Sequence, residues 1–154
     1  FITKGGRTVY GGGGISPDIY SEQNLEFNKS TNNILFHPDR LTFKFAQKLK
    51  NDIQIEYDTF KDFTKNYHIN NKNKNKFFSW LEAQEIEFIK EELEEHWDYI
   101  QNRILSNIAS SIWGKEYLFK QLLETDIQAL DALDHFQEAH KLINSFKAPD
   151  KVSE

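Results

Sequence analysis

The stretch Gln84–Trp113 constrains the fold most, because it contains neither proline nor glycine and repeats an apolar residue every three or four positions. These apolar positions are Ile86, Ile89, Leu93, Trp97, Ile100, Ile104, Ile108 and Ile112. The spacing matches the period of one face of an α-helix. It predicts either one helix of about 45 Å or two helices with a break near His96 and Trp97. Gly114 is expected to end the helical stretch, and the fold is expected to be mainly α.

Segments on both sides of this stretch predict further helices. A helix is expected over residues 38–50, because proline suits the first helical turn and an apolar residue recurs every four positions. Short helices are expected over Thr59–Tyr67 and Tyr117–Leu123, whereas Ile53–Tyr57 alternates like a short extended link. A capping-box pattern at Thr125 predicts one last helix, to about Phe146. We therefore expect an irregular bundle of four to six helices.

The region before Gln84 contains a polar run followed by the first members of a group of aromatic residues. Asn70–Lys76 contains only asparagine and lysine and predicts a solvated loop; a nucleic-acid loop is the weaker alternative, because no aromatic residue alternates with the lysines. The pattern Ser79-x-x-Glu82 predicts a helix start near Trp80. The aromatic residues are expected to form the core where helices cross, and an exposed apolar patch at the first three is the alternative. They are Phe77, Phe78, Trp80, Phe88, Trp97, Tyr99, Trp113, Tyr117 and Phe119.

Composition excludes several classes of function. The chain has no cysteine, which excludes a disulfide framework, a thiolate zinc site and a cysteine nucleophile. Its net charge of −5 divides into +4 over residues 1–76 (12 basic, 8 acidic) and −9 over residues 77–154 (7 basic, 16 acidic). The acidic half disfavours a nucleic-acid partner. The chain contains no run of about eighteen apolar residues, so the sequence predicts no transmembrane helix. The absence of methionine suggests a processed or cut product.

The first twenty residues differ from the rest by their many glycines. Gly5-Gly6 predicts a two-residue hairpin turn, because glycine adopts positive φ at little cost. Gly11–Gly14 carries no Cβ atoms and predicts a close approach of the backbone to another surface. The sequence therefore predicts a short N-terminal β arm at residues 1–20, a polar linker at residues 21–33 and a helical domain at residues 34–154.

Eight residues of this arm carry a resemblance to a known family. They are Thr3, Gly6, Arg7, Gly12, Gly14, Ile15, Pro17 and Asp18. The pattern Thr-x-x-Gly-Arg followed by Gly-Ile-x-Pro-Asp resembles the segment that closes the catalytic domain of the bacterial C-terminal-processing (tail-specific) serine peptidases. In that family the segment follows the catalytic serine and lysine. The resemblance therefore implies that the eight residues are structural and that the Ser-Lys dyad lies upstream, outside this chain.

The resemblance also implies a function, partners and a location. The chain is expected to be a non-catalytic C-terminal fragment of a periplasmic or cell-envelope serine endopeptidase, without catalytic, cofactor-binding or metal-binding residues of its own. Its helical part is expected to brace the protease, assemble it or control substrate access. The expected partners are the missing catalytic domain, protein substrates reached through the parent enzyme, and a second copy joined through the N-terminal arm, with no nucleic acid. The alternative is a stand-alone helical protein-interaction module.

Other candidate sites in the sequence are weaker. Lys4 lies inside the Thr-x-x-Gly-Arg strand and no serine motif precedes it, so we reject it as a catalytic lysine. Gly11–Gly14 lacks the Lys-Ser/Thr pair of a phosphate-binding P-loop. Glu91, Glu92, Glu94 and Glu95 predict a solvated acidic face, with partner binding through that face as the alternative.

The histidines are scattered and predict surface pairs more than a metal site. His135 and His140 are five positions apart, whereas two histidine ligands on one helical face are usually four apart. Asp131 shares a face with His135, and Glu92 shares a face with His96. Each of these pairs supplies only two ligands, so we expect no metal and no other cofactor.

Overall fold

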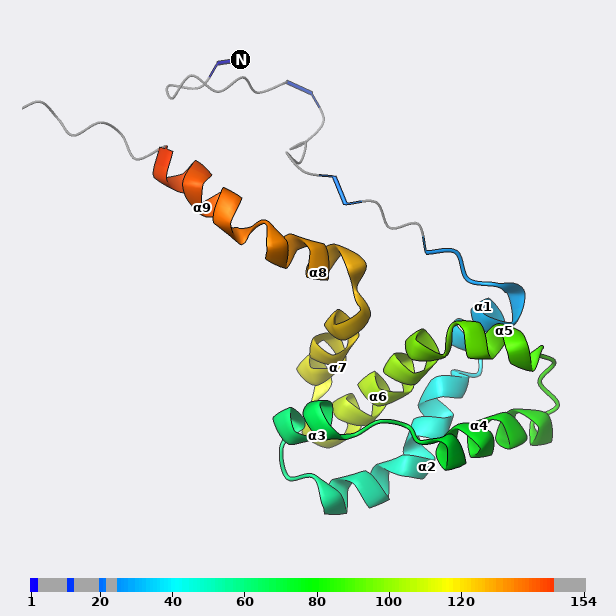
Figure 1. The fold of residues 1–154 in the computed structure, drawn as a ribbon. Coiled ribbons are helices and arrows are strands. Elements are labelled where there is room, and N and C mark those ends of the chain that lie inside the picture. Colours follow the sequence, from blue (N-terminus) through cyan, green and yellow to red (C-terminus); the bar gives the residue numbers. More distant parts are fainter. Residues whose placement is uncertain (3–10, 13–19, 22–24, 146–154) are drawn as a thin grey trace, which may run out of the picture. The chain divides into compact units, whose positions relative to one another are not determined.

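The computed structural model describes residues 1–2, 11–12, 20–21 and 25–145 (Figure 1). The chain divides into two compact units. One unit, Asn24–Asp126, is called the bundle unit; the other combines Phe1–Gln23 with Ile127–Glu154 and is called the terminal unit. Within the described residues, no helix is both long enough and apolar enough to cross a membrane.

The bundle unit is built from short helices around α6, its longest helix. The bounds are α1 Lys29–Leu35, α2 Leu41–Glu56, α3 Phe60–Asn66, α4 Asn71–Ala83, α5 Lys90–Glu95, α6 Trp97–Trp113, α7 Lys115–Leu122 and the 3-10 turn η1 Leu123–Thr125. Helix α6 packs against α2 and α7, and α1 packs against α2, α5 and α6. Ile100, Ile104 and Ile108 of α6 are fully buried. Their burial confirms the apolar stripe that the sequence predicts.

Aromatic side chains join α2, α4 and α6 in the core of the bundle unit. Phe77 of α4 is fully buried, and its ring centroid lies 4.9 Å from that of Phe45 and 5.9 Å from that of Trp97. Aromatic pairs at such distances stabilise a core beyond the area that they bury. The predicted aromatic core is confirmed here, and Phe63 of α3 adds to it, whereas Phe119 is 58% exposed.

The loop predicted at Asn70–Lys76 is wrong, because these residues cap and begin α4. The Asn70 side chain accepts a hydrogen bond from the Asn73 N–H at 2.9 Å, which satisfies one donor of the first turn. The helix is stabilised further along by Phe77 and Phe78, which are both buried. Their burial also makes the alternative of an exposed aromatic patch wrong. The lysines and asparagines of the first turns lie mostly on the solvated face.

Substitution of Asn70 by alanine tests this cap. The Asn73 N–H then loses its acceptor, and we expect the free energy of unfolding to fall by about 1 kcal/mol. Urea unfolding followed by far-UV circular dichroism measures the change. Asn75→Ala is the matched control, because Asn75 is exposed inside the same helix and alanine has the higher helix propensity. Equal destabilisation by the two substitutions would contradict the capping role.

The extended link predicted at Ile53–Tyr57 is also wrong, because α2 continues to Glu56. Ile53 is buried and extends the apolar stripe of α2 by one turn beyond Leu49. Ile55 is 85% exposed, so the alternation of isoleucines does not mark a strand. Burial of one helical face therefore outweighs the β propensity of this segment.

Helical structure is interrupted twice between α4 and α6. Helix α4 ends at Ala83, so Ser79-x-x-Glu82 lies in its last turns and does not start a helix. Residues 84–89 are not helical, and α5 and α6 separate at His96. Of the two alternatives, two helices with a break near His96 are observed, but a helical start at Gln84 is wrong, because α5 begins at Lys90. The predicted end at Gly114 is confirmed, since its φ of 120° favours glycine.

The terminal unit contains α8 Ile127–Asp134 and α9 Phe136–Ser145, which separate at His135. The single last helix predicted by the sequence is therefore wrong. The described residues hold nine α-helices where four to six are expected, although the mainly α class is confirmed. Neither His96 nor His135 is a proline or glycine, so the spacing leaves the first break as one of two alternatives and does not indicate the second.

The N-terminal arm lies largely outside the described residues, so its hairpin stays a prediction. The predicted polar linker at residues 21–33 contains the start of α1 at Lys29. Asn28 caps this helix, and its Oδ1 accepts a hydrogen bond from the Thr31 N–H at 2.9 Å. Residues 24–33 also belong to the same compact unit as the helices that follow them.

Candidate functional site

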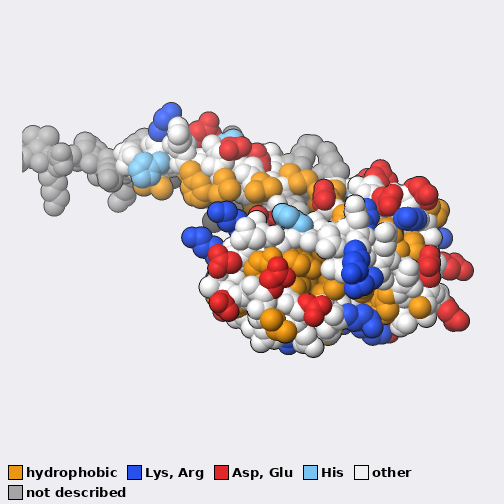
Figure 2. All heavy atoms as spheres, turned by 60° about the horizontal axis from the view of Figure 1, so that its bottom comes forward, with side chains coloured by type: hydrophobic (Ala, Val, Ile, Leu, Met, Phe, Trp, Pro, Cys, Tyr) orange, Lys and Arg blue, Asp and Glu red, His pale blue; other side chains and the backbone are white. Residues whose placement is uncertain are grey.

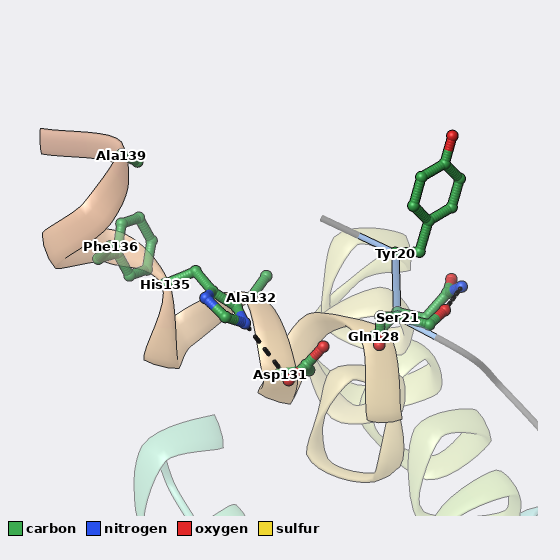
Figure 3. A pocket seen from close by; sticks show the side chains of 8 residues that line it. All are labelled: Tyr20, Ser21, Gln128, Asp131, Ala132, His135, Phe136 and Ala139. Atoms are coloured by element: carbon green, nitrogen blue, oxygen red, sulfur yellow. Dashed lines mark hydrogen bonds and ion pairs between the residues drawn. The ribbon is translucent and has the colours of Figure 1, made fainter. Parts of the chain in front are cut away.

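A hollow in the terminal unit lies between the segment Tyr20–Ser21 and the helices α8 and α9 (Figure 3). We call it the terminal hollow. Its volume is about 510 Å³, within the range of about 300–1,000 Å³ typical of ligand pockets. The lining residues are Tyr20, Ser21, Gln128, Asp131, Ala132, His135, Phe136 and Ala139. The terminal hollow therefore begins two positions after Asp18, the last residue of the peptidase-like pattern.

Gln128 fixes the chain segment on one side of the terminal hollow. Its Nε2 donates a hydrogen bond to the backbone carbonyl oxygen of Ser21 at 3.2 Å. Figure 3 shows Gln128 directed toward Ser21, and Tyr20 beside them. Because the acceptor is a backbone atom, the contact does not depend on the serine side chain. The Gln128 side chain of helix α8 thus binds the main chain of the segment Tyr20–Ser21.

The contacts of His135 in the terminal hollow indicate a structural role and not a catalytic one. Its Nε2 lies 3.8 Å from Asp131 Oδ1, and its Nδ1 lies 3.3 Å from Glu138 Oε2. A serine, a histidine and an aspartate therefore line one hollow, the residue types of a hydrolytic triad. The triad mechanism requires a ring nitrogen that accepts the serine proton. Here both ring nitrogens face carboxylates, so His135 is not placed to activate Ser21.

Helices α8 and α9 also carry exposed apolar side chains, which we call the apolar row. The row consists of Ile127, Leu130, Leu133, Phe136 and Ile143, with 37–65% of each side chain exposed. Figure 2 shows hydrophobic side chains following one another along this segment. A contiguous exposed apolar surface marks an interaction site, whereas single exposed apolar residues do not. The last helices therefore present a surface suited to binding a protein.

The residues of the peptidase-like pattern are not tested by this geometry. Thr3, Gly6, Arg7, Gly14, Ile15, Pro17 and Asp18 lie outside the described residues. Gly12 is described, and its φ of 121° favours glycine, although a Cβ there would meet nothing within 4 Å. At Gly11, a Cβ would lie 3.1 Å from a ring carbon of Phe1. A close approach is thus observed at Gly11 and not at Gly12.

Three of the four glutamates predicted to form a solvated acidic face, Glu91, Glu94 and Glu95, are exposed, whereas Glu92 is half-buried. The Asn28 Nδ2 lies 2.8 Å from the Glu92 carbonyl oxygen, 3.1 Å from Glu95 Oε2 and 3.0 Å from His96 Nδ1. The Ser30 N–H donates to Glu92 Oε2 at 3.0 Å. Glu92 and His96 therefore contact α1 and its cap. Among the described residues, no three histidine, aspartate or glutamate side chains are placed to hold a metal ion.

The contact with Ser30 predicts a pH dependence of stability. Hydrogen bonds from the Ser30 hydroxyl and backbone N–H lower the pKa of Glu92 below its ordinary value of about 4.5. A lowered folded-state pKa stabilises the protein above the unfolded value, and this stability is lost as pH falls through the folded pKa. Glu92→Gln should therefore destabilise at pH 7 and lose its effect in acid, measured by thermal unfolding across pH. Glu91→Gln, at an exposed position of the same helix, is the control.

Sequence reasoning missed Tyr20, Ser21 and Gln128. No local pattern marks these residues, and the hydrogen bond between Ser21 and Gln128 joins positions 107 apart in the chain. The apolar positions of α8 and α9 are visible in the sequence as a helical face. The exposure of these apolar residues is not visible in the sequence, because periodicity cannot distinguish a buried face from an exposed one.

Comparison with known proteins adds one match. A model described as "Family of unknown function (DUF8443)" matches residues 39–114. The matched segment begins just before α2 and ends at Gly114, so it lies within the bundle unit and outside the terminal hollow. No curated protein matches the chain. No solved structure matches it.

Proposed function

We propose that this chain is the non-catalytic C-terminal region of a bacterial tail-specific serine endopeptidase, and that its last two helices brace the catalytic domain. The observation that carries the proposal is the order of the eight pattern residues between Thr3 and Asp18. The parent enzyme would place this chain in the periplasm or cell envelope. The contact of Gln128 with Ser21 and the apolar row support the bracing role.

The bracing role follows from the distance along the chain between the peptidase-like pattern and α8. Asp18 ends the pattern, and the Ser21 carbonyl three residues later accepts the hydrogen bond from Gln128. Three extended residues span at most about 11 Å. A catalytic domain that closes at Asp18 is therefore tied to α8 by a very short connection. Such a tie restricts the motion of the closing strand relative to the helices.

The apolar row supplies a surface for the catalytic domain. Burial of exposed apolar side chains stabilises a contact by about 25 cal/mol per Å² removed from water. The described acidic side chains of α8 and α9, Asp131, Asp134 and Glu138, lie among these apolar residues. Carboxylates next to the apolar row do not suit an anionic lipid surface. A protein surface is the better partner.

The alternative is a stand-alone helical interaction module. It is favoured by the same apolar row, which can bind a separate protein as well as a domain of the same chain. The two functions differ in what precedes Phe1 in the gene. They also differ in whether the partner of the row is covalently attached.

The coding sequence upstream of Phe1 tests the proposal directly. We expect it to continue in frame and to encode a serine at a helix start, followed by a Gly-Lys-Gly segment. The chain itself is expected to leave an unfolded protein substrate uncut. An upstream sequence without these motifs would exclude the peptidase hypothesis and favour the interaction module. Measurable turnover by the purified chain would refute the non-catalytic role.

A further inference from the structure

A polar cavity in the bundle unit is lined by residues of α3, α6, α7 and η1 and of the segment after α3. Its volume is about 280 Å³. The lining residues are Thr64, Tyr67, His68, Asp98, Gln101, Asn102, Leu105, Gln121, Glu124 and Thr125. We call it the amide cavity, because three of its lining side chains are amides. None of its lining residues lines the terminal hollow or belongs to the peptidase-like pattern.

The buried wall of the amide cavity has a fixed geometry. Gln121 Nε2 donates to Asn102 Oδ1 at 2.9 Å, and Asn102 Nδ2 donates to Thr125 Oγ1 at 2.8 Å. The Thr64 hydroxyl lies 3.3 Å from Gln121 Oε1. Asn102 and Gln121 are both buried. A buried polar network with its partners in place is rigid and specifies one arrangement, so the cavity is preorganised.

The exposed rim of the amide cavity is acidic. Asp98, in the first turn of α6, and Glu124, in η1, both line the cavity and are exposed. Within the part of the chain that the structure describes, neither carboxylate makes an ion pair or a hydrogen bond. No lysine or arginine lines the cavity. Two free carboxylates from different elements thus line one preorganised hollow, together with the exposed His68.

We propose that the amide cavity binds the guanidinium group of an arginine side chain from a polypeptide. A guanidinium carries five N–H donors and no acceptor, which matches carboxylate rims and amide or hydroxyl oxygens in the wall. Its plane can also stack on an aromatic ring such as Tyr67. The volume lies below the range of about 300–1,000 Å³ for whole small-molecule ligands and suits one side chain. This inference does not depend on the proposed function.

Titration of the full chain with N-acetyl-arginine methylamide tests the inference. Nitrogen-15 NMR should show saturable shifts of the Asn102 and Gln121 side-chain amides and of the Thr125 backbone amide. N-acetyl-lysine methylamide should bind more weakly, because an ammonium group cannot donate two parallel hydrogen bonds from one plane. The citrulline analogue, which keeps the shape without the charge, should leave these signals in place. A peptide with one internal arginine should bind at least as well as the single residue, which distinguishes a polypeptide ligand from a free metabolite.

Charge-neutral variants locate the binding to this cavity. Asp98→Asn combined with Glu124→Gln should weaken binding by at least about tenfold, since two charge-assisted contacts are lost. Glu82→Gln combined with Glu91→Gln removes the same charge from exposed positions outside the cavity and should leave the affinity nearly unchanged. Equal weakening by both pairs, equal shifts with citrulline, or the absence of saturation would each overturn the proposal.

Discussion

Phe77→Ala is expected to lower the free energy of unfolding by about 3–5 kcal/mol. Phe77 is fully buried, and its ring contacts those of Phe45, Phe78, Trp80 and Trp97. Truncation removes the transfer free energy of the ring and leaves a cavity that several rigid aromatic neighbours cannot fill by collapse. Since a domain is stable by about 5–15 kcal/mol, the loss should bring the bundle unit close to unfolding. Guanidinium unfolding, followed by the fluorescence of the three tryptophans, which all lie in the bundle unit, measures the loss.

Phe119→Ala is the matched control for this prediction. Phe119 is also a helical phenylalanine of the bundle unit, but more than half of its side chain is exposed. Its truncation should cost less than about 1 kcal/mol, because little area returns to water. If the two variants lost the same stability, α4 would not be packed against α2 and α6 through Phe77.

The sequence predicts the helices of this chain wherever an apolar stripe is long enough to show its period. The stripe of α6 and the first turns of α2 are read correctly because their buried residues recur every three or four positions. Helix α4 is missed because its first half is asparagine and lysine, and only the Asn70 cap and the later burial of Phe77 make it helical. Local composition therefore gives a wrong prediction for a polar segment whose helical structure depends on its cap and on burial of the residues that follow it.

The break at His96 coincides with a contact that is distant in sequence, whereas the contacts at the break at His135 are local. His96 lies between α5 and α6, and its ring nitrogen is 3.0 Å from the Asn28 amide, 68 residues earlier. His135 lies between α8 and α9, and its ring meets the carboxylates of Asp131 and Glu138. The capping box predicted at Thr125 is replaced by a different contact, because the Thr125 hydroxyl accepts from Asn102. Propensity cannot anticipate such tertiary partners.

Substitutions in the exposed apolar row are expected to weaken binding of the catalytic domain strongly. If the row braces a catalytic domain, carboxylates placed in it must remove apolar contacts and bury unpaired charge at the interface. Leu133→Asp combined with Phe136→Asp should weaken binding of the chain to its separately produced catalytic domain. Each side chain contributes about 1.5–3 kcal/mol when fully buried, so the pair should lower the affinity by at least about 100-fold. Isothermal titration calorimetry measures the change.

The same two carboxylates placed elsewhere on α9 separate apolar docking from general charge repulsion. Gln137→Asp combined with Asn144→Asp adds equal charge at exposed polar positions outside the row, and its affinity should stay within about threefold of the unmodified chain, as surface substitutions usually do. Far-UV circular dichroism should show the same helix content in both variants, because neither pair removes a buried residue. An undiminished affinity of the Leu133/Phe136 variant would mean that another surface holds the catalytic domain. An equal loss in both variants would assign the effect to charge and not to burial of the row.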